Sequence, residues 1–67
     1  MLVDSDPAVE LLTVAEAARL LRISVSGMRR LQQARRIPFV KVGGSVRFNT
    51  RDLVAYVRSN RVEAIGQ

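Results

Sequence analysis

Two helix starts lie close together in this chain, and they limit its fold more than any other feature. Thr13 is a good N-cap, and Glu16 three residues later completes a capping box. Ser24 is a second N-cap, and only a short break over residues 21–24 precedes the helix that it begins. The sequence therefore predicts two short helices joined by a tight turn, which is the pattern of a helix-turn-helix.

Apolar residues recur at helical spacing in both segments. In the first helix they fall at i, i+3, i+4 and i+7, as Val14, Ala17, Ala18 and Leu21. The second helix is expected to run to about Ala34, with a narrower apolar side of Val25, Met28 and Leu31. Each helix is thus predicted to bury one side.

Alternating apolar residues after Pro38 predict two strands with a turn at residues 43–45. A two-residue Gly-Gly loop would pair Lys41 with Val46 and set the apolar valines of the two strands on opposite sides. A three-residue loop brings the apolar residues together, with the pairs Val42 with Val46, Lys41 with Arg47 and Val40 with Phe48. We expect the three-residue loop, in which a phosphate between Lys41 and Arg47 would offset their repulsion.

A third helix is predicted after the hairpin. Asn49 or Thr50 caps it, Asp52 suits its N-terminal dipole, and it ends near Asn60. Its predicted buried side consists of Leu53, Tyr56 and Val57. The fold class is mainly α with a small β-hairpin, a winged helix-turn-helix of residues 11–60 between a flexible acidic arm, residues 1–10, and a short tail, residues 61–67.

The composition excludes several classes of protein. The chain has no cysteine and no histidine, which removes thiolate and most zinc sites and the usual nucleophile–base pairs. We therefore expect no enzyme, no metal, no cofactor and no small-molecule substrate. No apolar run has the length of a membrane span, and the N-terminus is acidic where a signal peptide is basic. A cytoplasmic protein without a membrane partner is expected.

Charge is distributed unevenly along the chain. Residues 1–18 contain four acidic residues and no basic one, whereas residues 19–67 contain all 11 lysines and arginines against Asp52 and Glu63. The net charge is +5. An acidic head on a strongly basic body indicates a polyanionic partner, and charge that only keeps a small domain soluble is the alternative.

The side of the second helix opposite its apolar residues carries Ser26, Arg29, Arg30 and Gln33. Arginine can bind guanine, glutamine can bind adenine, and serine can reach bases or phosphates. Solvated helix arginines are the alternative, but no acidic residue lies among them to pair with them. The full candidate DNA-binding set is Ser24, Ser26, Gly27, Arg29, Arg30, Gln33, Lys41, Gly44, Ser45 and Arg47.

Residues 11–57 resemble the excisionase-type, MerR-like winged-helix family. The resemblance rests on "LLTVAEAARLL", Ser24, Ile37-Pro38, "VKVGG", Arg47 and "DLVAYV". It implies that the second helix enters the major groove of DNA and that the hairpin lies along the adjacent minor groove or backbone. Small members of this family include phage and plasmid excisionases, or recombination directionality factors, which bind cooperatively beside an integrase's sites and bend the DNA. Other members are short transcriptional regulators.

This chain departs from the family pattern in three places. Arg22 stands where glycine is usual, at a left-handed position that disfavours other residues. Gly27 lies inside the second helix, where it costs helix stability or allows close approach to DNA. "ARRIP" replaces a commoner small-glycine-acidic sequence and adds charge.

Three functions stay open on the sequence. The first is an excisionase, with an integrase as partner and self-association along DNA. The second is a small MerR-like transcriptional regulator. The third is a protein-interaction adaptor that uses the helix-turn-helix as a scaffold.

Overall fold

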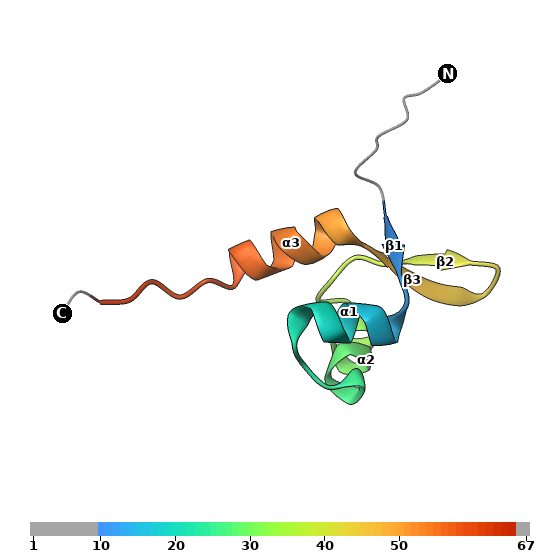
Figure 1. The fold of residues 1–67 in the computed structure, drawn as a ribbon, viewed down its shortest axis with the longest axis horizontal. Helices are drawn as coiled ribbons and strands as arrows, with labels where there is room; N and C mark the ends of the chain where they lie inside the picture. Colours follow the sequence, from blue (N-terminus) through green and yellow to red (C-terminus); the bar gives the residue numbers. More distant parts are fainter. Residues whose placement is uncertain (1–9, 66–67) are drawn as a thin grey trace, which may run out of the picture.

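A computed structural model describes residues 10–65, and its helices and strands form a winged helix-turn-helix. The elements in chain order are β1 (Leu11–Leu12), α1 (Val14–Leu21), α2 (Val25–Gln33), β2 (Val40–Val42), β3 (Ser45–Asn49) and α3 (Thr50–Ser59). The β2–β3 hairpin projects to one side of the α1–α2 pair, and α3 extends to the other (Figure 1). The predicted acidic arm lies outside the described residues except for Glu10.

The N-terminus of α1 has the predicted capping box. The Thr13 hydroxyl accepts a hydrogen bond from the Glu16 backbone N–H at 3.1 Å, and a Glu16 carboxylate oxygen accepts one from the Thr13 N–H at 2.9 Å. Ser24 caps α2 and Asn49 caps α3, each through a side-chain oxygen that accepts a backbone N–H. Local side-chain chemistry therefore sets the start of every helix.

Helices α1 and α2 end in the same way, each with an arginine in the left-handed conformation. Arg22 has φ 60° and Arg35 has φ 54°, so both lie in the left-handed region that favours glycine. The next residue, Ile23 or Arg36, donates its N–H to a carbonyl five positions earlier, at 3.0 and 2.9 Å. Both helices thus end in a left-handed turn that contains no glycine.

The sheet has three antiparallel strands in the order β1-β3-β2, one strand more than the sequence predicted. Leu11 pairs with Asn49 and Leu12 with Phe48, and the Thr50 N–H continues the pairing to the Glu10 carbonyl at 3.0 Å. A strand of two residues is too short to show alternation, so only its pairing with β3 identifies it. It connects the start of α1 to the hairpin.

The predicted hairpin register is wrong. Strands β2 and β3 pair as Val40 with Arg47, Lys41 with Val46 and Val42 with Ser45, so the loop has two residues, Gly43 and Gly44. Both glycines have positive φ, 57° and 87°, as a two-residue turn matched to the twist of a hairpin requires. The prediction took Val40 and Val42 as the inward residues, but both are exposed. The inward aromatic residue is Phe39, whose ring lies 6.5 Å from that of Phe48.

The core joins every part of the fold. Its fully buried members are Ala17, Ala18, Met28, Ile37, Phe48 and Leu53. Two residues predicted to be core are exposed, Val25 at 42% and Val57 at 53%. Val25 is the first residue of α2, where the helix has not yet reached its neighbours, and Val57 lies on the part of α3 that extends away from the sheet (Figure 1).

Candidate nucleic-acid interface

Helix α2 presents one polar, exposed face. Met28 is buried and Leu31 packs against the core, which orients the helix. The opposite side carries the four residues that the sequence placed there, Ser26, Arg29, Arg30 and Gln33, and all of them are exposed. The structure therefore brings the α2 part of the candidate set together on one surface.

The structure explains why position 27 is a glycine, which the sequence alone did not reveal. Its N–H donates to the Ser24 hydroxyl at 3.0 Å, and a Cβ at this position would lie only 3.2 Å from the same oxygen. This distance is shorter than usual contacts, so a larger residue would push the capping hydroxyl away. Gly27 keeps the start of α2 compact at the end of the exposed face.

Val25 is a residue of this face that sequence reasoning missed, because it was assigned to the core. It lies one turn before Arg29 and two turns before Gln33 on the same side of the helix. An exposed valine among arginine and glutamine can contact the methyl group of thymine, the only apolar group on a base edge in the major groove. The signal that could have found it is its place in the first turn of a recognition helix.

The hairpin divides the predicted wing residues between two faces. Since neighbouring residues alternate along a strand, the observed register sets Lys41 on the side of Val46 and Phe48, and Ser45 and Arg47 on the other side. Lys41 and Arg47 therefore do not face each other. Gly44 forms the exposed loop tip with Gly43.

Arg47 is only half-exposed and is held by its surroundings. Its guanidinium donates a hydrogen bond to the Val46 carbonyl at 2.8 Å. Its charge also acts on α1: the pKa of Glu16 is lowered, mainly by the hydrogen bond from the Thr13 N–H, with smaller contributions from Arg19 and Arg47. The charge of Arg47 thus adds slightly to the stabilisation of the Glu16 carboxylate.

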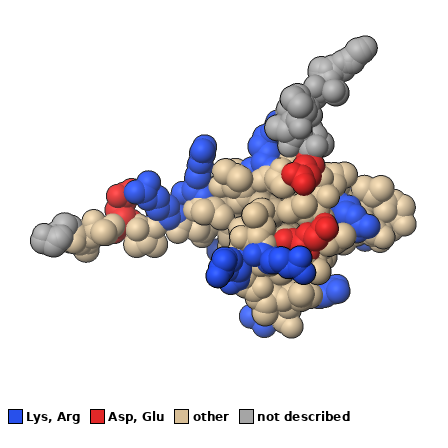
Figure 2. Space-filling model, viewed as in Figure 1, with Lys and Arg blue, Asp and Glu red and all other residues tan. Residues whose placement is uncertain are grey.

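The surface around α2 is basic. No acidic residue occurs between Glu16 and Asp52, a stretch that contains nine of the 11 lysines and arginines. Figure 2 shows basic side chains in the lower part of the view, with an acidic patch bordering the upper ones. Within residues 10–65, neither Arg29 nor Arg30 has an ion-pair partner. These arginines are available to an external anion.

Comparison with known protein families matches residues 11–61 to the family described as helix-turn-helix domain. The chain belongs to this family. The matched segment includes all six helices and strands, so the helix-turn-helix family covers the whole folded part of the chain. No curated protein and no solved structure matched the chain.

Membership of the helix-turn-helix family supports DNA binding, with α2 in the position of the recognition helix. Among residues 10–65, no helix has the length and hydropathy needed to cross a membrane. Within the same residues, no three potential ligands from histidine, cysteine, aspartate and glutamate form a group that could hold a metal ion.

Proposed function

We propose that this helix-turn-helix protein binds double-stranded DNA with sequence preference, with α2 in the major groove and the hairpin along the neighbouring backbone or minor groove. The observation that carries the proposal is the exposed face of Ser26, Arg29, Arg30 and Gln33, whose two arginines have no ion-pair partner among residues 10–65. Arg29 and Arg30 supply bidentate donors for guanine and Gln33 for adenine. Roughly five neutralised phosphates would give a salt dependence with a slope near −4 to −5.

We further propose that the protein acts as an excisionase and performs no catalytic step itself. In this role, copies bind cooperatively along DNA, bend it and direct a site-specific integrase toward excision. The resemblance of residues 11–57 to excisionases suggests the role, and a second surface of the protein supports it. Cooperative binding through protein contacts needs a surface that leaves the polar face of α2 free for DNA.

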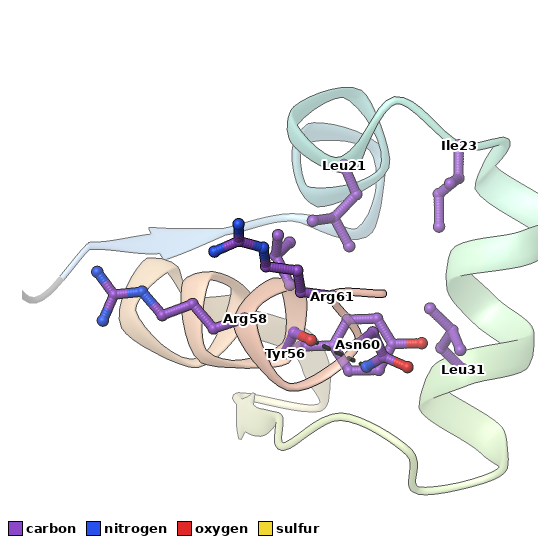
Figure 3. Close-up of a pocket in the computed structure, with 8 residues that line it drawn as sticks. Leu21, Ile23, Leu31, Tyr56, Arg58, Asn60 and Arg61 are labelled. Atoms are coloured by element: carbon purple, nitrogen blue, oxygen red, sulfur yellow. Dashed lines mark hydrogen bonds between the residues drawn. The ribbon is translucent and has the colours of Figure 1, made fainter. Parts of the chain in front are cut away.

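That second surface is an apolar groove of about 470 Å³ between α1, α2 and the end of α3. Leu21, Ile23 and Leu31 point toward the Tyr56 ring across it (Figure 3). Leu31 belongs to the inward side of α2, so the groove lies away from the polar face. A protein ligand in the groove and DNA on α2 can therefore be bound together.

The ligand that fits this groove is the tail of a neighbouring copy. Val62 and Ile65 are 89% and 94% exposed, more than any other large apolar residue described. Glu63 lies between them and pairs with Arg61 of its own tail at 3.6 Å, so Arg58 is the groove cation left for the carboxylate of a neighbouring tail. A tail bound to the next copy's groove would produce a head-to-tail row along DNA.

Selection of bound sequences from a random duplex pool tests the proposed role. Closely spaced direct repeats, filled cooperatively and with bending of the DNA, support an excisionase. An inverted repeat instead indicates the small MerR-like regulator. No enrichment contradicts sequence-specific binding by the protein alone.

Cooperativity can be tested separately on a duplex with two adjacent sites. Val62→Ser with Ile65→Ser should abolish cooperative filling and leave the affinity for one site unchanged. Val54→Ser is the control, because this exposed valine of α3 lies outside the groove. If the tail variant fills both sites as cooperatively as the wild type, the tail does not join neighbouring copies.

A further inference from the structure

A cleft between the end of α2 and the base of the hairpin gathers three positive charges. Its polar lining consists of Gln32, Arg35, Arg36 and Lys41, and Ile37, Pro38 and Phe39 supply the apolar part. The volume is about 780 Å³, and no acidic side chain from the described part of the chain lines it. The cleft begins at Gln32, in the last turn of α2, and extends to Lys41 of the hairpin.

The observed hairpin register brings Lys41 to this cleft. Lys41 alternates with Phe39 along the chain, and both lie on the side of the hairpin that faces Val46 and Phe48. In the register predicted from the sequence, Lys41 would have been opposite Arg47. The two-residue loop instead places it with the two arginines that follow α2.

Arg35 occupies this cleft at a cost to the backbone. Its φ of 54° lies in the left-handed region, where glycine would avoid strain of about 1–2 kcal/mol. The strain does not improve the helix end, because glycine would make the same closing hydrogen bonds through the backbone. Arg22 carries the same strain at the end of α1, so the strain alone does not distinguish Arg35.

We propose that this cleft binds one phosphate of the DNA backbone, next to the groove that α2 enters. Two guanidinium groups from the end of α2 and an ammonium group from the hairpin line the same cleft, and each can donate to a phosphate oxygen. A phosphate held there fixes the hairpin relative to α2 on the DNA. The inference rests on the proposed DNA binding but not on the excisionase role.

The negative end of the α2 dipole lies at this cleft and would repel an anion, but the chain offsets part of that charge. The carbonyls of Leu31 and Gln32 accept hydrogen bonds from the backbone N–H groups of Arg36 and Arg35, at 2.9 and 3.1 Å. These carbonyls are thus partly neutralised by the chain itself. The three cations of the cleft exceed the remaining partial charge.

The chain offers a matched control for Arg35. Arg22 has the same left-handed conformation and the same closing hydrogen bonds, but it lies beside Glu10, Glu16 and Arg19 on the side of α1. Arg22→Gly and Arg35→Gly each remove one positive charge and one strained residue. Only their places on the molecule differ.

The experiment measures duplex affinity against salt concentration for both variants, together with their melting temperatures. Both should melt a few degrees higher than the wild type, since the strain is relieved. Arg35→Gly should bind roughly tenfold more weakly at moderate salt and lose about 0.9 from the salt slope. Arg22→Gly should bind as the wild type does. Arg35→Lys keeps the charge and should keep most of the slope.

Equal slopes for Arg35→Gly, Arg22→Gly and the wild type would overturn the phosphate site while leaving DNA binding by α2 intact. Equal losses for both glycine variants would overturn it too, because the effect would then come from net charge alone. A wild-type protein with no salt-dependent affinity for duplex DNA would overturn the proposed function together with this inference.

Discussion

Helix α2 and the β2–β3 hairpin both carry basic residues that the sequence assigned to DNA, but the fold treats them differently. On α2, Arg29 and Arg30 lie on one exposed face. On the hairpin, Lys41 and Arg47 lie on opposite faces, and Arg47 is half-buried against its own backbone. A helical face follows from residue spacing alone, whereas the face of a strand depends on a register that one loop residue can reverse.

The largest effect is expected on α2. Arg29→Ala with Arg30→Ala should lower affinity for a specific site at least about 100-fold, because each bidentate arginine contributes about 1–3 kcal/mol. Melting should change little, since both side chains are exposed and unpaired within the described residues. Titration of a labelled duplex and a thermal melt check the two parts.

A charge-matched control sharpens this result. Arg19→Ala with Arg58→Ala removes two exposed arginines from α1 and α3 and should leave sequence preference unchanged on a single-site duplex. Unfolding of the α2 variant would show that its arginines support the fold and would contradict the assignment of the face.

In a second experiment, substitutions of the two basic hairpin residues should have different effects. Lys41→Ala should reduce the salt slope by about 0.9 with no change in melting. Arg47→Ala should instead lower stability by about 1 kcal/mol, because it removes a part-buried hydrogen bond and packed methylene groups. Salt titrations and melts of both variants give the comparison. If both variants remain fully folded and lose DNA affinity equally, the two faces of the hairpin contribute equally to DNA binding.

Most of the helical part of the fold could be predicted from the sequence. The capping box of Thr13 and Glu16, the cap at Ser24 and the end of α3 near Asn60 are confirmed. These features depend on residues a few positions apart, so a single sequence contains the information. The exposed face of α2 follows from the same helical period.

The parts that could not be predicted depend on contacts distant in sequence. Strand β1 exists because Leu11 and Leu12 pair with β3, far along the chain. The hairpin register depended on Phe39, which lies just outside the strand and was not counted among the inward residues. The cleft with Arg35 and Lys41 depends on that register, so it could not be predicted from the sequence.

A smaller effect is expected at Val25, the exposed residue of α2 that was predicted from the sequence to be buried. If it contacts a thymine methyl, replacing that thymine by deoxyuridine should weaken wild-type binding about fivefold, or roughly 1 kcal/mol. Val25→Ala should bind the two duplexes equally. Binding measurements for both proteins on both duplexes form a complete cycle. Equal wild-type affinities at every thymine of the selected site would show that Val25 does not read the methyl group.

The smallest effect concerns Glu16 at the start of α1. The pKa of Glu16 is lowered in the folded state, chiefly by the Thr13 N–H and less by Arg19 and Arg47. A lowered pKa stabilises the fold above the unfolded value, and this stability is lost as the pH falls through the folded value. Melting temperature should therefore decrease as the pH drops from about 5 to below 4, and less steeply in Glu16→Gln.

Arg47→Lys is the companion variant for this titration. It keeps the charge near Glu16 and should leave the acid dependence close to that of the wild type. Because Arg47 is only a minor cause of the shift, even Arg47→Ala should keep most of it. An acid dependence unchanged in Glu16→Gln would mean that other carboxylates produce it and that the capping box contributes no pH-dependent stability. A dependence lost in Arg47→Ala would instead make the contact between hairpin and α1 the dominant one.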